Sequence, residues 1–106
     1  MSEYNPDKWV IVKFNDNDKS WYRVLGSWSG GYTDGDSWRM SSGIDNIEEN
    51  GDFYLVMNAS GSTYKCHKDA EGMHILSTSI LETAKKHGSE NGVTVTTITV
   101  PEFMDK

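Results

Sequence analysis

The chain has 106 residues, 36% of them hydrophobic, and a formal net charge of −6. This length fits a single domain, so we expect residues 1–106 to share one core. The negative charge disfavours nonspecific binding to nucleic acid or to anionic membranes. Cys66 is the only cysteine, which excludes an intramolecular disulfide. No apolar run approaches the ~20 residues that span a bilayer, and we expect a cytoplasmic protein without a membrane segment.

The N-terminal part of the chain predicts a β-hairpin. Residues 8–14, KWVIVKF, have the pattern of a strand, and three apolar side chains share one face: Val10, Val12 and Phe14. The turn-forming residues 15–18, NDND, follow, and residues 19–26 predict a second strand. We therefore expect these two strands to pair with each other.

Shorter strands follow in the middle of the chain. Residues 37–41 and 43–49 are candidate strands, and Asn50-Gly51 is typical of a type I′ turn leading into the next strand. After the turn at residues 58–61, the run STYKCHK predicts a half-buried strand whose inward face carries Tyr64 and Cys66. We therefore interpret Cys66 as a core residue rather than a reactive nucleophile.

The C-terminal half predicts one helix between residues 73 and 88. Its apolar residues recur at helical spacing: Met73, Leu76, Ile80 and Ala84. Ser79 and Glu82 match a capping box, and Gly88 follows basic residues in the manner of a helix-ending glycine. The helix therefore begins near His74 or at Ser79.

The last strand and the fold class follow from these elements. The β-branched run at residues 92–100 predicts a final strand. The whole pattern predicts a mainly β (α+β) fold, either a twisted antiparallel sheet or a partly open barrel. We expect about five to seven strands, with one helix in the C-terminal half covering an open face.

The chain carries no catalytic signature, so we expect neither an enzyme nor a cofactor. Cys66 and His67 point to opposite faces of a strand and cannot chelate one ion together. Asp16-Asn17-Asp18 and Asp34-Gly35-Asp36 begin like calcium loops but lack glycine at the sixth position. We interpret these aspartates as turn-closing residues and predict no metal site. An acid/base pair that forms only in the fold would leave no mark in the sequence.

Residues 26–39, GSWSGGYTDGDSWR, are the strongest candidate for a binding surface. Their glycines, at positions 26, 30, 31 and 35, permit positive φ and predict an ordered loop that presents side chains. Aromatic and arginine side chains are common anchors of interfaces. The predicted partner- or ligand-binding residues are Trp28, Tyr32, Asp34, Asp36, Trp38 and Arg39. The alternative is a packed hairpin end, in which Trp28 and Trp38 meet across the strands as core.

Three segments, WYRVLGSWSGGYTDGDSWRMSSGI, GDFYLV and GSTYKCHK, carry a resemblance to known proteins. The chain resembles small uncharacterised proteins encoded by T-even-type tailed phages, over roughly residues 9–81. No activity and no functional residue is attached to these motifs. The resemblance implies an accessory protein that acts in the cytoplasm of an infected bacterium, where small phage proteins commonly bind host components.

We therefore expect a non-enzymatic binding protein whose partner is a host or phage protein. The alternative is a small-ligand protein that sequesters a nucleotide-like compound between the aromatic side chains and Arg39, and a third hypothesis is decoration of the virion. Nucleic acid is a poor partner, because Arg23 and Arg39 lie beside Asp34 and Asp36 rather than in a cluster of cations. No pattern in the chain indicates an oligomeric state.

Overall fold

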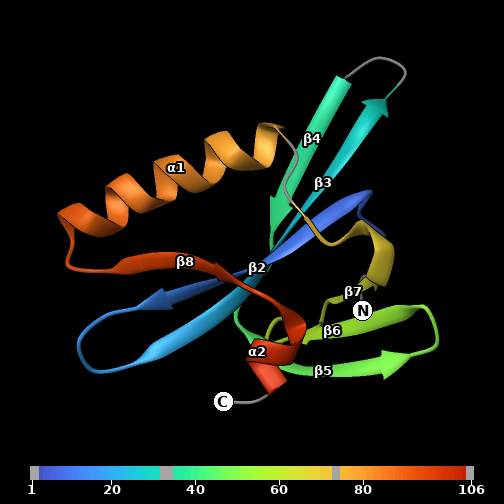
Figure 1. The fold of residues 1–106 in the computed structure, drawn as a ribbon, viewed down its shortest axis with the longest axis horizontal. Helices are drawn as coiled ribbons and strands as arrows, with labels where there is room; N and C mark the ends of the chain where they lie inside the picture. The colour runs from blue at the N-terminus through green and yellow to red at the C-terminus, as the bar shows by residue number, and fades with distance from the viewer. Residues whose placement is uncertain (1–2, 32–34, 73–74, 105–106) are drawn as a thin grey trace.

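The computed structural model describes residues 3–31, 35–72 and 75–104 (Figure 1). The described part contains eight strands: β1 (Glu3–Tyr4), β2 (Lys8–Asn15), β3 (Ser20–Gly31), β4 (Gly35–Met40), β5 (Ile44–Asn50), β6 (Phe53–Asn58), β7 (Thr63–His67) and β8 (Thr94–Ile98). It also contains a short 3-10 helix and two α-helices: η1 (Lys68–Ala70), α1 (Ile75–Glu90) and α2 (Val100–Met104).

The strands form two open four-stranded sheets. Sheet A has the order β1-β7-β6-β5, and sheet B has the order β4-β3-β2-β8. Neighbouring strands are antiparallel except for β1, which pairs parallel to β7. The fold is therefore mainly β with one substantial helix in the C-terminal half, as predicted, and the strands divide between two sheets that do not close into a barrel (Figure 1).

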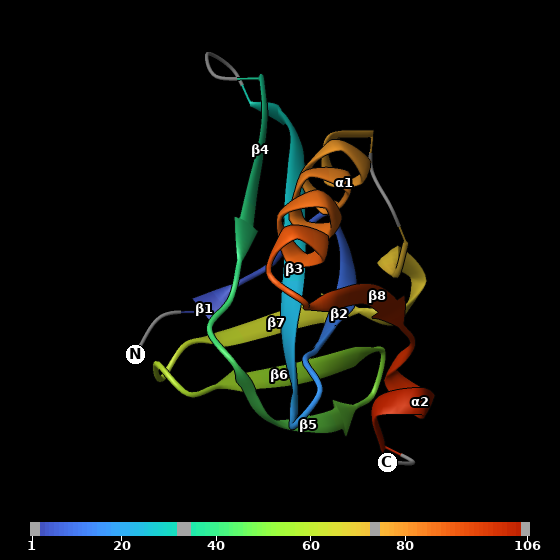
Figure 2. The same cartoon turned by 90° about the vertical axis from the view of Figure 1, so that its left-hand side faces the viewer.

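The molecule has three layers because sheet B is covered on both faces. Sheet A packs on one face, and α1 lies across the other, in front of β3 in Figure 2. The central strand β2 is accordingly apolar on both sides. Trp9 and Ile11 belong to the core between the sheets, whereas Val10 and Val12 belong to the core beneath α1. A strand covered on two faces needs such a continuous apolar run rather than a strict alternation.

The core between the sheets includes the inward face of β7. Tyr64 and Cys66 are 1% and 0% exposed, so the predicted burial of this face is confirmed. Trp9 spans the interface, and its Nε1 donates a hydrogen bond of 2.7 Å to the carbonyl oxygen of His67. The other buried members of this core come from β3, β5, β6 and α2: Val24, Ile47, Val56, Val100 and Phe103.

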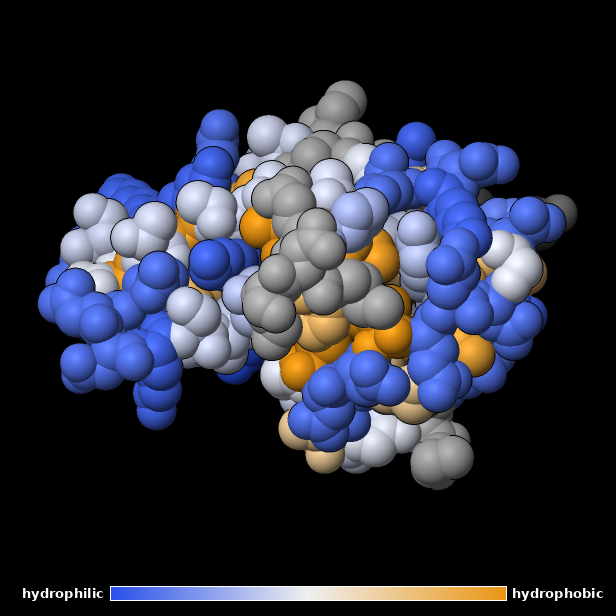
Figure 3. Space-filling view, turned by 60° about the horizontal axis from the view of Figure 1, so that its bottom comes forward, coloured by the Kyte–Doolittle hydropathy of each residue, from blue (hydrophilic) through white to orange (hydrophobic). Residues whose placement is uncertain are grey.

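Hydrophobic side chains also reach the surface where α2 meets sheet A. Figure 3 turns the bottom of Figure 1 forward and shows hydrophobic residues in the middle of that face, between hydrophilic margins. A hollow of about 280 Å³ beside α2 is lined by Ile47, Glu49, Tyr54, Val100 and Pro101. In the described ranges, no helix has both the length and the apolar composition needed to cross a membrane.

The turn between β2 and β3 is closed by Asp16. Its Oδ1 accepts hydrogen bonds of 2.9 Å from the backbone N–H groups of both Asp18 and Lys19. These bonds favour the ionised carboxylate and lower the pKa of Asp16. The interpretation of this aspartate as a turn-closing residue is therefore confirmed, whereas the similar Asp34 lies outside the described residues.

The predicted hairpin at Asn50-Gly51 is present, but its turn is displaced by one residue. Asn50 pairs with Phe53, which leaves Gly51 and Asp52 as the two central residues of the turn. Gly51 has a φ of 60°. A type I′ turn needs positive φ at both central residues, and no described non-glycine residue, Asp52 included, has positive φ, so the predicted type I′ assignment is wrong.

The predicted helix is confirmed, and its start at Ile75 agrees with the predicted start near His74, whereas the alternative start at Ser79 and the predicted end at Gly88 are wrong. Helix α1 runs from Ile75 to Glu90, so Ser79 lies inside it and cannot be its N-cap. Gly88 also lies within the helix rather than after it. The helix ends before Gly92, whose φ of 74° is the left-handed conformation that glycine adopts readily. Packing of α1 on sheet B therefore extends the helix beyond its local end signal.

The predicted ordered loop at residues 26–39 is instead mostly a long β-hairpin. Strand β3 continues to Gly31, and β4 begins at Gly35. The pairing of β3 with β4 shifts register between Trp28 and Gly31, which marks a bulge or irregularity. Gly26 is not among the glycines with positive φ. It sits instead where a side chain has no room, because a Cβ at this position would lie 2.9 Å from Pro6 Cβ.

Candidate functional site

The described structure places only part of the predicted binding surface. Trp28 lies in β3, and Trp38 and Arg39 lie in β4. Tyr32 and Asp34 lie outside the described residues, and Asp36 is described only as a backbone position of β4. The site must therefore be built from three of the six predicted residues and from the side chains that surround them.

The three described residues divide between the two faces of sheet B. Trp28 is paired with Ser37, whereas Trp38 is paired with Ser27, so the two tryptophans do not face each other across the hairpin. Arg39 and Trp28 both contact Tyr4, and Trp38 points to the face that α1 covers. Side chains alternate along a strand, and this alternation separates Trp38 from Arg39. The predicted surface is therefore two surfaces, and Trp28 and Trp38 are not one packed pair.

Tyr4 organises the face that carries Arg39. An Arg39 guanidinium nitrogen, Nη1, donates a 3.1 Å hydrogen bond to the Tyr4 hydroxyl, and its Cζ lies 4.6 Å from the Tyr4 ring centre. Trp28 meets the same ring edge-on at 6.4 Å. The Nε1 of Trp28 also donates a 2.8 Å hydrogen bond to the carbonyl oxygen of Asn5. Trp28 therefore holds the N-terminal segment in place rather than standing free as a binding side chain.

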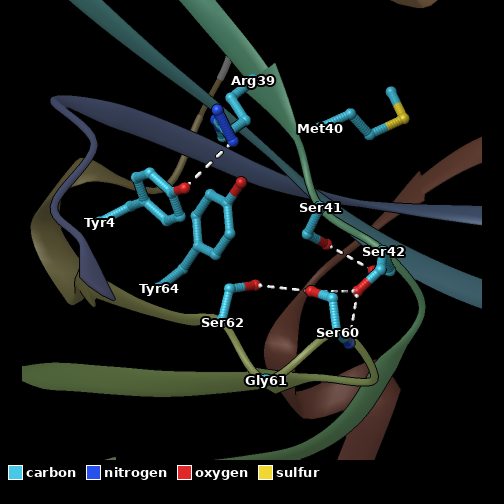
Figure 4. Close-up of a pocket in the computed structure, with 9 residues that line it drawn as sticks. All are labelled: Tyr4, Arg39, Met40, Ser41, Ser42, Ser60, Gly61, Ser62 and Tyr64. Carbon is cyan, nitrogen blue, oxygen red and sulfur yellow. Dashed lines mark hydrogen bonds between the residues drawn. The ribbon is translucent and has the colours of Figure 1, made fainter. Parts of the chain in front are cut away.

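A polar pocket of about 440 Å³ opens beside Arg39 (Figure 4). It lies where the chain crosses from sheet B to sheet A, between β4, the residues after it, the β6–β7 turn and the short strand β1. Its described lining is rich in hydroxyl groups and includes no acidic side chain: Tyr4, Arg39, Met40, Ser41, Ser42, Ser60, Gly61, Ser62 and Tyr64. The pocket therefore combines the positive charge of Arg39 with neutral hydrogen-bonding groups.

Three of the serines form a hydrogen-bonded chain along one wall of the pocket. Ser42 Oγ donates to Ser60 Oγ at 3.0 Å, and the backbone N–H of Ser60 donates to Ser42 Oγ at 3.1 Å. Ser60 Oγ lies 3.2 Å from Ser62 Oγ. Figure 4 shows this row of hydroxyls running below the two tyrosines. The row ties the β6–β7 turn to the segment after β4 and fixes the shape of the wall.

Ser41 and Tyr64 form the deeper part of the pocket. Ser41 is a structural residue, because its Oγ accepts a 2.9 Å bond from the Val24 N–H and donates a 2.7 Å bond to the Ser42 carbonyl oxygen. Tyr64 is 1% exposed, and its hydroxyl points toward Arg39 in Figure 4. Burial raises the pKa of Tyr64 to about 12, so its hydroxyl remains a proton donor at neutral pH.

The other surface is a groove of about 460 Å³ between sheet B and α1. Strand β4 contributes Trp38 and Met40, β3 contributes Arg23, and the helix contributes Ile80, Thr83 and Ala84. Trp38 is 45% exposed and is the only exposed large hydrophobic residue in the described part of the chain. The Arg23 Nε is buried and has no hydrogen-bond partner among the described residues. The groove thus combines an exposed indole ring with an arginine whose hydrogen-bonding capacity is incompletely used.

The described residues provide no centre for metal or thiol chemistry. No three of their His, Cys, Asp and Glu side chains come close enough to hold a metal ion. Cys66 is fully buried, and burial raises the pKa of its thiol to about 12. A thiol in this setting is uncharged at neutral pH and shielded from reagents.

Most of the pocket has no direct signal in the amino-acid sequence. Tyr4 stands in a short polar lead, and Ser60 and Ser62 fall in a segment that reads simply as a turn. Ser42 lies 18 positions from Ser60 along the chain. The shared abundance of serine in SSG and SGS is the one local signal, and only the crossing between the sheets brings these segments together.

Comparison of the chain with protein-family models, with curated proteins and with solved structures gave no match.

Proposed function

We propose that this chain is a non-enzymatic binding protein that docks a protein partner in the groove between β4 and α1. The observation that carries the proposal is Trp38, whose side chain lines this groove and remains 45% exposed. Exposing so large an apolar ring to water is unfavourable, and tryptophan, arginine and methionine are enriched at protein interfaces. The groove brings all three residue types together in Trp38, Arg23 and Met40.

The chemistry of the groove suggests the features of the partner. Met40, Ile80 and Ala84 form an apolar floor that suits an aliphatic or aromatic side chain. Arg23 lines the same groove, and among the described residues no carboxylate lines it. Arg23 has no ion-pair partner among the described residues, and such an arginine favours an acidic group on the incoming chain. The partner therefore presents an apolar anchor with an acidic residue close to it.

The resemblance to T-even-type phage proteins bears on where in the cell this interaction takes place. It suggests that the protein acts in the cytoplasm of an infected bacterium and that its partner is a host or phage protein. Bacterial lysate and purified phage particles are therefore the two sources in which to seek it. Recovery of the chain in purified particles would favour the virion-decoration hypothesis over a role in the host cytoplasm.

A second candidate function, small-ligand binding, is favoured by a separate observation. The pocket beside Arg39 is polar, has no acidic side chain among the described residues that line it, and has a volume of about 440 Å³, within the usual range for small-molecule sites. It lies on the face of sheet B opposite Trp38. The two candidate functions therefore use opposite faces of sheet B and can be tested separately.

Affinity purification from bacterial lysate, carried out with matched variants, tests the docking proposal. Trp38→Ala should weaken capture of a specific protein by about 2 kcal/mol or more, because a central tryptophan is a common interface anchor. Arg23→Gln should weaken it as well. Trp21→Ala is the control, since this half-buried tryptophan stacks on Phe14 outside the groove. Capture that survives Trp38→Ala unchanged would refute the groove as the docking site.

A further inference from the structure

The side chains that line the pocket beside Arg39 have more hydrogen-bond donors than they use in bonds to other described residues. The guanidinium has five N–H donors, and its one recorded hydrogen bond to a described residue goes to the Tyr4 hydroxyl. That hydroxyl accepts, so its own proton remains available to a ligand. Among the described residues, no hydrogen bond engages the Tyr64 hydroxyl. Three donor groups therefore converge at the upper end of the pocket shown in Figure 4.

The serine wall adds a further donor. Ser42, Ser60 and Ser62 share two oxygen-to-oxygen hydrogen bonds, which use two of their three hydroxyl protons. Ser62 Oγ also lies 3.3 Å from the Asn58 amide nitrogen, from which it accepts. Whether Ser60 or Ser62 donates in the bond between them, one hydroxyl proton of the three serines has no acceptor within the row. The row can therefore donate to a ligand and can also accept from one through the remaining lone pairs.

The charge of the pocket selects an anion. Arg39 supplies a positive charge, and none of the residues that the structure describes in the lining is acidic. Among the described residues, the ion pair is between Lys68 of η1 and Glu49 of β5, neither of which lines this pocket. The chain as a whole carries −6, so a general attraction for anions is absent and recognition would depend on this local geometry. Convergent donors around a guanidinium suit an oxyanion, above all a phosphate group.

The volume of the pocket and the contacts of its aromatic rings further limit the class of ligand that fits. A volume of about 440 Å³ leaves room for an organic body beyond the phosphate group. A nucleobase would need an open aromatic face, but the Tyr4 ring already contacts Arg39 on one side and Tyr64 at 5.0 Å. The remaining wall is the serine row, which matches the hydroxyl groups of a sugar or polyol.

We propose that this pocket binds a small phosphate monoester with a hydroxylated body, of the sugar phosphate class. Arg39 and the hydroxyls of Tyr4 and Tyr64 hold the phosphate, and Ser42, Ser60 and Ser62 hold the hydroxylated body. The site deepens the small-ligand candidate function and replaces a stacked nucleotide with a ligand that needs no aromatic platform. It does not depend on the docking groove, because Trp38 lies on the other face of sheet B.

Calorimetric titration with defined probes tests the proposal. Ribose 5-phosphate should bind, whereas inorganic phosphate and ribose should each bind at least about tenfold more weakly, since each satisfies only part of the site. Adenosine monophosphate should bind no more tightly than ribose 5-phosphate. Tighter binding of the nucleotide would overturn the assignment of the ligand class. The absence of binding by ribose 5-phosphate and glucose 6-phosphate at millimolar concentrations would overturn the site.

Variants tie the binding to the proposed residues. Arg39→Gln and Tyr4→Phe should each weaken ribose 5-phosphate binding about tenfold or more, because each removes a donor to the anion. Tyr4→Phe keeps the ring, so it separates the loss of the hydroxyl from a loss of packing. Trp38→Ala is the matched control and should leave this affinity unchanged. Equal affinity in wild type, Arg39→Gln and Tyr4→Phe would refute the proposal even if the ligand binds elsewhere on the protein.

Discussion

Trp38 and Arg39 are consecutive in β4, yet their side chains lie on opposite faces of sheet B. Trp38 lines the groove against α1, and Arg39 lies against Tyr4 beside the serine pocket. A binding surface inferred from sequence proximity therefore becomes two independent surfaces. We therefore expect that replacing Trp38 leaves the pocket beside Arg39 intact, and that replacing Arg39 leaves the groove intact.

This separation predicts additive and modest effects on stability. Because Trp38 is 45% exposed, Trp38→Ala should lower the free energy of unfolding by about 1–2 kcal/mol, less than the ~3–5 kcal/mol typical of a fully buried tryptophan. Arg39→Gln should add to this loss independently, because the two side chains lie on opposite faces of the strand and have no common interaction partner among the described residues. Denaturant unfolding of both single variants and the double variant measures these terms. A coupling energy above about 0.5 kcal/mol would contradict the separation.

Gly26→Ala should destabilise the protein. A Cβ at this position would lie 2.9 Å from Pro6 Cβ and 3.6 Å from a ring carbon of Tyr64. Overpacking of this kind costs about 1–3 kcal/mol. Gly43→Ala is the control, since its Cβ would meet nothing within 4 Å. Thermal melts of the two variants should differ clearly, and equal melting temperatures would show that Pro6 moves aside without cost.

Gly88→Ala should also destabilise, although alanine is the better helix former. In an open helix this exchange stabilises by about 0.5–1 kcal/mol. Here the new Cβ would lie 2.6 Å from the Val93 carbonyl oxygen and 3.0 Å from Val95 Cγ2. The exposed neighbour Ser89→Ala provides the control for helix propensity. A rise in melting temperature on Gly88→Ala would show that α1 does not pack this closely on the strand that follows it.

Cys66 should react slowly with a thiol reagent until the protein is unfolded. Its side chain is fully buried, and its Sγ lies 3.7 Å from the Tyr64 carbonyl oxygen, to which it can donate. Labelling kinetics with and without denaturant measure the protection. Stoichiometric labelling of the native protein within seconds would mean that β7 is not shielded by the facing sheet.

The buried thiol of Cys66 should cause the free energy of unfolding to decrease at alkaline pH. Burial raises the pKa of Cys66 from 9.0 to about 12, so above pH 9 the unfolded chain releases this proton and the folded chain keeps it. The unfolded state then binds fewer protons, and the free energy of unfolding decreases as pH rises from about 9 toward 12. Tyr64 acts in the same direction only above its ordinary pKa of 10.0. Unfolding at pH 8 and pH 9.5 should therefore show a larger decrease for wild type than for Cys66→Ala.

Local patterns in the sequence determined the class of the fold. The alternation in STYKCHK predicted which face of β7 is buried, and the spacing of Leu76, Ile80 and Ala84 predicted a helix where α1 lies. Aspartate in NDND predicted the closed turn after β2, which Asp16 closes with two backbone hydrogen bonds. These properties depend on side-chain periodicity and on bonds between neighbours, which a linear sequence displays directly.

Tertiary structure decided the helix boundary, the role of Gly26 and the composition of both candidate surfaces. The end of α1 extends past Gly88 because Val93 and Val95 pack against it, and Gly26 is required by the approach of Pro6. Ser42 and Ser60 meet only because the chain passes from sheet B to sheet A between them. Contacts between segments distant in the chain depend on how whole elements pack, and no spacing of residues within one segment specifies them.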